Sequence, residues 1–332
     1  MEIKQYAPIC IPTLNRYEHF KRCLESLERC TGAEKTEVYI GLDYPPSDKY
    51  VEGWGKINAY LAKKEKTNGF KNLIVHRRDH NCGVGSPTSN GSLLLKEAQT
   101  VSDRYILTED DNEFSPNYIL YLNQCLEKYK DNPNILYICG WSNPRRSSDI
   151  TLGKFIHNAY PMHGFSAFGY GGWFNKSVVD FYKKEEIIYS YRNTIWAMTH
   201  HHSLMIHNLL PFMRSEAQIG DVIREYYCAR NGVYCIFPTI SKVRNWGYDG
   251  SGEHCVIWGD ACGAKIDTNT TFSLDDFEIK DFPEIRCVEK LVYDETPKFK
   301  LYFCVEYIWF RLTKKLVKDS WLFRKIKKYV FK

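Results

Sequence analysis

Three consecutive carboxylates, Glu109-Asp110-Asp111, are the residues whose types and spacing most directly indicate chemistry in this sequence. They follow the apolar run 105–108, and adjacent negative charges at the end of a buried strand repel one another at a high cost in free energy. A divalent cation relieves this repulsion, because Mg²⁺ and Mn²⁺ prefer oxygen ligands and bind through one or two carboxylates plus phosphates. The alternative is a solvated turn in which Asp111 or Ser115 caps the next helix. The apolar run that leads into the triplet favours the metal site.

Polar residues also follow the other apolar runs. Thr13, Asn15 and Arg16 come after the first run, where a strand-to-helix turn can offer backbone N–H groups and hydroxyls to a nucleotide. The alternative there is that Asn15 simply caps the helix. Asp43 ends the second run and either binds a nucleobase or ribose hydroxyl or belongs to a turn. The segment 81–91 is rich in Gly, Ser and Asn, which permits close approach of a ligand, but it lacks the Lys-Ser/Thr ending of a P-loop.

The elements that must position these residues alternate through the first 140 residues. Strands are expected at 7–12, 38–43, 73–76, 105–108 and 135–139, and helices at 16–29, 50–66, 92–99 and 118–130. This alternation predicts an α/β fold with a mixed, mainly parallel sheet flanked by helices. Ligands of such sheets bind beyond the carboxyl ends of the strands, where the polar residues gather.

The second half of the chain is less regular. Helices are expected near 177–186, 193–210 and 217–231, a strand at 233–237 and a loop at 245–254.

Over about residues 5–260 these segments resemble the GT-A glycosyltransferases, nucleotide-sugar-dependent enzymes with a Rossmann-like donor half, and among them family 2-like enzymes of bacterial polysaccharide synthesis. The segments that carry the resemblance are IPTLNR (11–16), GLD (41–43), NCGVGSPTSNG (81–91) and ILTEDDNEFSP (106–116). The last is similar to the DxD-type metal motif in a Glu-Asp-Asp form, without a strict Asp-x-Asp.

The resemblance implies a role for individual residues. It makes Asp111 the direct metal ligand and Asp110 a ribose-binding or supporting residue. The residues implied in binding the nucleotide are Pro12, Thr13, Asn15, Arg16, Asp43, Asn81, Gly83 and Asn90.

The resemblance also implies a catalytic base at the start of a helix, and Asp221 is the candidate. An inverting transfer requires such a carboxylate to accept the proton of the acceptor hydroxyl, although an acid in the first turn of a helix is also favoured by the helix dipole. His254 is implied as a metal or diphosphate ligand and Arg244 as a diphosphate ligand; alternatively both are exposed surface residues. The segment 169–174 either walls a sugar pocket or forms a tight turn in the core.

Two other patterns indicate no chemistry. His200-His201-His202 with His207 lacks the HExxH spacing of a zinc site. The 12 cysteines contain no CxxC pair and follow no signal peptide, so reduced, buried thiols are expected.

The C-terminal segment 297–332 has its own composition. It carries 11 Lys or Arg against two acids, so it contributes +9 while 1–296 contributes −4 to a net charge of +5. Interleaved aromatic and basic residues are typical of an amphipathic helix at a membrane interface; the alternative is a last helix packed on the body. The predicted organisation is a donor half (1–140), an acceptor half (141–296) and a membrane-associating tail (297–332).

The expected function is transfer of a sugar from a nucleotide diphosphate donor, in particular a UDP-sugar, to a saccharide or lipid-linked saccharide, with Mn²⁺ or Mg²⁺ and with inversion. The expected location is the cytoplasm, peripheral on the inner membrane, and no nucleic-acid partner is expected. The alternatives are a sugar nucleotidyltransferase and a non-catalytic sugar- or membrane-binding protein.

Overall fold

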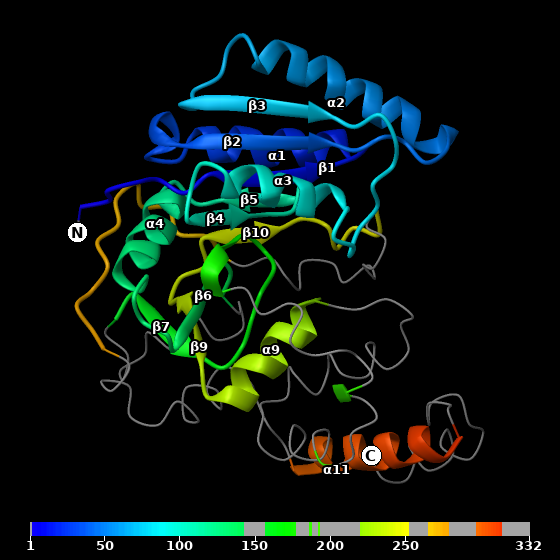
Figure 1. Ribbon diagram of the computed structural model, residues 1–332, viewed down its shortest axis with the longest axis vertical. Helices are drawn as coiled ribbons and strands as arrows, with labels where there is room; N and C mark the ends of the chain where they lie inside the picture. Colours follow the sequence, from blue (N-terminus) through cyan, green and yellow to red (C-terminus); the bar gives the residue numbers. More distant parts are fainter. Residues whose placement is uncertain are drawn as a thin grey trace.

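The apolar runs of the sequence form an eight-stranded sheet in the order β3-β2-β1-β4-β8-β6-β9-β7. The computed structural model describes residues 2–142, 157–176, 186–187, 192, 220–251, 265–278 and 297–313 (Figure 1). The strands are β1 (Ile9–Thr13), β2 (Glu37–Leu42), β3 (Asn72–Arg77), β4 (Arg104–Leu107), β6 (Ile135–Cys139), β7 (Ala159–Met162), β8 (Tyr170–Trp173) and β9 (Tyr234–Pro238). The strands β3, β2, β1 and β4 are parallel, whereas β8 and β7 run antiparallel to their neighbours.

Helices cover both faces of the sheet. The described helices on the sheet are α1 (Tyr17–Glu28), α2 (Val51–Lys64), α3 (Asn90–Gln99), α4 (Tyr118–Lys128) and α9 (Gly220–Asn231), with short 3-10 turns at Ala33–Lys35, Asp48–Tyr50 and Phe174–Lys176. A further helix, α11 (Pro297–Thr313), lies apart from the sheet (Figure 1). The alternation of side chains along β1 explains the layers, because Ile9 and Ile11 join the core with α1 and α4 while Cys10 packs against α3. The predicted mixed, mainly parallel sheet flanked by helices is therefore confirmed.

The predicted elements of the first half match β1 to β4, β6 and α1 to α4 with small shifts at their ends. The segment 169–174 instead contains β8, a fully buried strand inserted between β4 and β6. A Cβ on Gly171 would lie 3.0 Å from Leu126 and one on Gly172 3.0 Å from Tyr105 and Tyr137, so these glycines make room for the core. The pocket wall that we considered for this segment is thus a core strand.

The segment that we expected to be a loop at 245–254 begins with part of a strand. β10 (Val243–Asn245) pairs antiparallel with β5 (Asn112–Phe114), which follows the acidic triplet. This pairing brings residues that are more than a hundred positions apart in the chain to the end of β4. The expected helices at 177–186 and 193–210, His200 to His202 and His207 lie largely or wholly outside the described residues.

The described cysteines are free thiols, and most of them are buried. In the part of the chain that the structure describes, no helix has the length and apolar character required to cross a bilayer.

Candidate functional site

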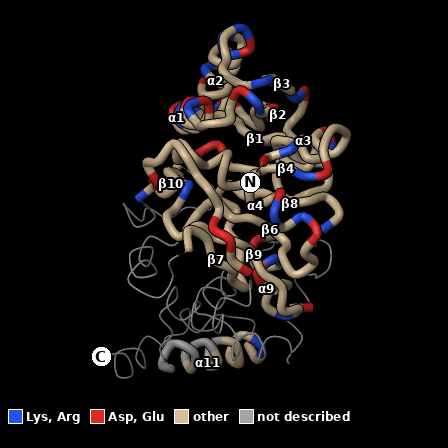
Figure 2. The backbone as a smooth tube through the Cα atoms, turned by 90° about the vertical axis from the view of Figure 1, so that its left-hand side faces the viewer, with Lys and Arg blue, Asp and Glu red and all other residues tan. Residues whose placement is uncertain are grey.

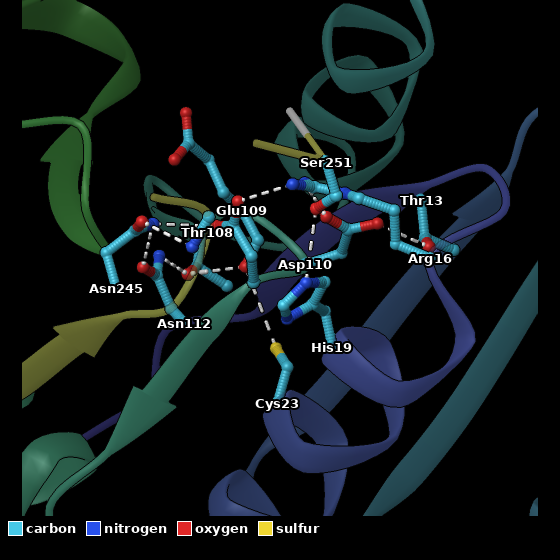
Figure 3. A network of polar contacts seen from close by, with 12 residues as sticks. Thr13, Arg16, His19, Cys23, Thr108, Glu109, Asp110, Asn112, Asn245 and Ser251 are labelled. Carbon is cyan, nitrogen blue, oxygen red and sulfur yellow. Dashed lines mark hydrogen bonds and ion pairs between the residues drawn. The ribbon is translucent and has the colours of Figure 1, made fainter. Parts of the chain in front are cut away.

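Glu109, Asp110 and Asp111, here called the acidic corner, lie between the end of β4 and the start of β5 (Figure 3). The Asp110 carboxylate turns towards the loop after β1, where the Thr13 hydroxyl donates a hydrogen bond to it over 2.8 Å. Arg16 donates to Asp110 through one guanidinium nitrogen and to Asp111 through another, the latter over 2.7 Å. The guanidinium therefore bridges two neighbouring carboxylates that are almost completely buried.

This bridge affects the ionisation of Asp110 and of Arg16. Burial raises the pKa of Asp110, and the positive charge of Arg16 opposes that rise. The two carboxylates in turn raise the pKa of Arg16, although its own burial acts in the opposite direction.

Asp111 is also held from the side of β10. The Asn245 amide donates a hydrogen bond to the second carboxylate oxygen of Asp111 over 2.7 Å. The backbone N–H of Trp246 donates to the backbone carbonyl of Asp111 over 2.9 Å. Gly247 packs so closely that a Cβ there would clash with the Asp111 carboxylate. The second half of the chain therefore fixes the orientation of the predicted metal ligand.

Glu109 differs from its two neighbours. Its side chain is exposed, and among the described residues its carboxylate has no hydrogen-bond or ion-pair partner. The surrounding protein removes part of the water around this carboxylate and so raises its pKa, and the charges of Asp111, Asp221 and Asp110 raise it further. Glu109 is thus the one carboxylate of the acidic corner that is free to meet a ligand.

Asp221, the predicted base, lies in the first turn of α9. Its side chain is 44% exposed, and its carboxylate is 3.8 Å from the Arg224 guanidinium. Desolvation raises the pKa of Asp221 and the charge of Arg224 opposes this. The charge of Asp221 acts on Glu109, so the structure brings the predicted base towards the acidic corner.

Arg224 is enclosed by aromatic rings. Its guanidinium carbon lies 5.6 Å from the ring centre of Tyr137, 4.8 Å from that of Phe165 and 5.5 Å from that of Tyr170. It also donates a hydrogen bond to the Tyr170 hydroxyl over 3.4 Å. These contacts, which the sequence did not reveal, hold a cation in place one helical turn after Asp221.

The predicted nucleotide residues after β2 form a second group. Asp43 is buried, and its carboxylate accepts hydrogen bonds from the backbone N–H groups of Tyr44 (2.9 Å) and Cys82 (2.8 Å). The Asn81 amide donates to the Tyr44 carbonyl over 2.7 Å, which joins the glycine-containing loop to the end of β2. Gly83 in this loop has a φ of 64°, a conformation that glycine adopts readily.

Asn90 serves a structural purpose. Its amide donates to the Gly41 carbonyl over 2.6 Å and accepts from Arg78 over 3.1 Å. Because its side chain occupies the space where a Cβ of residue 41 would lie, it joins α3 to β2. Arg78, which we did not identify from the sequence, is brought to this group by that contact.

The helix caps that we considered as alternatives are absent from this region. The N-cap of α1 is Arg16 and that of α4 is Asn117, and neither helix start has a side-chain cap hydrogen bond. Asn15 instead lies against Gly53 of α2 through its backbone carbonyl, and Pro12 is half-buried against Gly91.

Arg244 stacks on an indole instead of extending into solvent. The Trp246 ring lies 4.0 Å from the Arg244 guanidinium carbon and 4.4 Å from that of Arg22, and its N–H donates to Glu113 over 2.8 Å. Two cations therefore flank one ring beside the acidic corner. His254 lies outside the described residues.

The oxygen ligands needed for a divalent cation are partly present. Among the described residues, no three His, Cys, Asp or Glu side chains are grouped to hold a metal ion. The donor set at this position is nevertheless the free carboxylate of Glu109 and that of Asp111, which are hard oxygen ligands. Mg²⁺ commonly takes one or two carboxylates and completes its shell with water and phosphate oxygens. Both carboxylate oxygens of Asp111 already accept hydrogen bonds, from Arg16 and from Asn245. A cation at the acidic corner would therefore share Asp111 with these donors, use Glu109 as its free carboxylate and take its remaining ligands from a bound diphosphate and water.

No family model and no curated protein matches the chain. Among solved structures, the chain is similar to S. aureus TarS, at 16% identity over 38% of this chain and 20% of that one, with a TM-score of 0.29. It is also similar to the mannosyltransferase PcManGT from Pyrobaculum calidifontis in complex with GDP-Man and Mn²⁺, at 11% identity over 71% of this chain and 57% of that one, with a TM-score of 0.35.

Proposed function

We propose that the chain is a glycosyltransferase of GT-A type that transfers a sugar from a UDP-sugar to a saccharide or a lipid-linked saccharide. The observation that carries the proposal is that the predicted binding residues lie together at one edge of the sheet. The loop after β1, Asp43 after β2 and the acidic corner after β4 follow neighbouring parallel strands, and the carboxyl ends of such strands are where ligands of open α/β sheets bind.

Each group in this arrangement has a function in the proposal. Asp43 and the loop after β1 bind the nucleoside, where buried, oriented oxygen and N–H groups provide specificity. Arg16 would supply positive charge at the diphosphate, and Asp111 and Glu109 would hold a divalent cation. When bound, that cation supplies stabilisation of the negative charge on the departing diphosphate.

Asp221 is the base in this proposal. Its carboxylate is partly exposed, its charge acts on Glu109, and its raised pKa brings it closer to the value at which a base is effective at neutral pH. It would accept the proton of the acceptor hydroxyl while the hydroxyl oxygen attacks the anomeric carbon from the face opposite the nucleotide, which inverts the configuration. Arg224 keeps part of the Asp221 population ionised by lowering its pKa.

The test is incubation of the protein with a panel of UDP-sugars and Mn²⁺, with release of UDP as the readout. Slow hydrolysis of one donor is expected, since glycosyl transfer to water needs no acceptor. Asp111→Ala should abolish both the hydrolysis and the Mn²⁺-dependent part of UDP binding. Asp276→Ala is the matched control, because its side chain is fully exposed and its ion-pair partner, Lys128 of α4, is not part of the acidic corner.

Other outcomes would overturn the proposal. Release of pyrophosphate from UTP and a sugar phosphate would indicate a nucleotidyltransferase. Binding of sugars without consumption of any donor would indicate a non-catalytic protein. A nucleotidyltransferase usually needs a glycine-rich loop with Arg and Lys immediately after the first strand. The residues directly after β1 include no glycine and offer only Arg16 as a cation, so we favour glycosyl transfer.

A further inference from the structure

The C-terminal helix α11 has two faces of different exposure. Tyr307 and Phe310 are buried, with 2% and 7% of their surface exposed. Large apolar side chains on the other face are exposed: Leu301 (64%), Val305 (47%), Ile308 (51%) and Leu312 (78%). We call these four residues the α11 stripe.

The spacing of the α11 stripe shows that it is continuous. Positions separated by four, three and four residues lie on one side of a helix with 3.6 residues per turn. Tyr307 and Phe310 fall on the opposite side by the same geometry. One face of α11 is therefore packed on protein, while an apolar row from Leu301 to Leu312 is turned outwards.

The position of α11 leaves that row accessible. In two views related by a quarter turn, α11 lies at the end of the long axis opposite α2 and β3, with α9 as a neighbouring element (Figures 1 and 2). α11 is thus far from the edge strand β3 and at the same end of the molecule as α9, the helix that carries Asp221.

The charge of the surrounding sequence identifies the occupant. Lys298, Lys300 and Arg311 lie within α11, and residues 314–332 contain eight further Lys or Arg against the single acid Asp319. A second copy that packed on the stripe would bring two strongly positive segments together, which is unfavourable. An anionic lipid surface instead attracts each of these cations with about 1 kcal/mol near the headgroups.

We propose that the α11 stripe inserts into the interface of an anionic membrane, with α11 lying parallel to the surface. The helix has 17 residues and includes charged positions, so it fits an interfacial helix, which buries one apolar face and leaves the opposite face outside the hydrocarbon. The protein is then a peripheral protein of an anionic leaflet such as the cytoplasmic face of a bacterial inner membrane. Membrane binding by this face is independent of whether the acidic corner transfers sugars.

The experiment is flotation of the full chain with vesicles of phosphatidylcholine containing phosphatidylglycerol, compared with phosphatidylcholine alone. The variant Ile308→Gln/Leu312→Gln removes half of the stripe without changing the charge. Because both side chains are already exposed, the folded state and its melting temperature should be unchanged. We expect the partition coefficient to fall at least tenfold.

The matched control is Val101→Gln, which removes an apolar side chain that is 50% exposed after α3. This variant should bind vesicles like the unmodified protein. UDP binding measured on all three proteins should be the same, so failure of the site and failure of the membrane surface are told apart.

Three results would overturn the proposal. The first is equal vesicle binding by the double variant, and the second is equal binding to neutral and anionic vesicles. The third is a dimer in light scattering that the double variant abolishes while the unmodified protein ignores vesicles, since this would assign the stripe to a second copy.

Discussion

Replacing Arg16 with Gln tests whether the acidic corner depends on an internal cation. The side chain of Arg16 is 22% exposed, and those of Asp110 and Asp111 are 8% and 6% exposed. Removing one partner of a buried ion pair costs about 3–5 kcal/mol, because a charge remains buried without compensation. Since Arg16 is partly exposed and Thr13 and Asn245 still donate to the carboxylates, we expect the lower end, about 3 kcal/mol.

The loss of folding stability in Arg16→Gln should depend on pH. Burial already raises the pKa of Asp110, and removing Arg16 takes away an influence that lowers it. A carboxyl group whose pKa is raised in the folded state destabilises that state when it is ionised. The loss of stability is therefore absent below the pKa of the unfolded chain, about 3.9, and grows as the pH rises through the pKa of the folded state. The difference in stability between the unmodified protein and Arg16→Gln should therefore be smallest near pH 4 and larger at pH 7.

Urea unfolding at several pH values measures this difference. Arg77→Gln is the matched control, because Arg77, like Arg16, donates two hydrogen bonds to carboxylate oxygens, in this case both on Glu65. The side chains of Arg77 and Glu65 are 34% and 36% exposed. An exposed pair of this kind contributes about 1 kcal/mol or less. Adding Asp110→Asn to Arg16→Gln should restore stability at pH 7. A loss no larger than in the control, or one that does not change with pH, would refute the reasoning.

Two further substitutions test the geometry of the site. Gly247→Ala should displace Asp111, because the new Cβ would clash with its carboxylate. Calorimetry should then show an at least tenfold lower Mn²⁺-dependent affinity for UDP. In the control Gly55→Ala, inside α2, the new Cβ meets no atom within 4 Å, so UDP binding should be unchanged and stability should rise by up to about 1 kcal/mol. Asp221→Asn should keep its affinity for UDP and lose sugar transfer in a product assay. In the unmodified enzyme, kcat plotted against pH should fall on the acid side at a pH above the ordinary pKa of 3.8, because a base with a raised pKa is ionised only at higher pH. Retained turnover in that variant would remove Asp221 as the base.

The order of elements in the first half followed from the sequence because short apolar runs are long enough for buried strands and their ends carry turn residues. β1, β2, β3 and β4 each lie within or beside the predicted runs. The antiparallel strand β8 was not predicted, because two of its four residues are glycines and its place in the sheet depends on Leu126 and the surrounding tyrosines.

The candidate site was predictable where chemistry and strand ends coincide. The acidic triplet, Asp43 and the loop after β1 were identified in this way, since polar side chains directly after apolar strands need partners. The sequence led us to assign roles to Asp111 and Asp110 and none to Glu109, and it gives no sign that the Glu109 carboxylate remains free.

By itself the sequence determined which residue types end the parallel strands, because local apolar patterns and turn residues specify strands and their limits. The tertiary structure alone decided how the three acids divide their tasks. The pairing of β10 with β5 brings Asn245 and Gly247 onto Asp111 from the far part of the chain. Since one guanidinium can bind only carboxylates that the fold places on its side, Asp110 and Asp111 share the single positive charge of Arg16 and Glu109 is left to solvent.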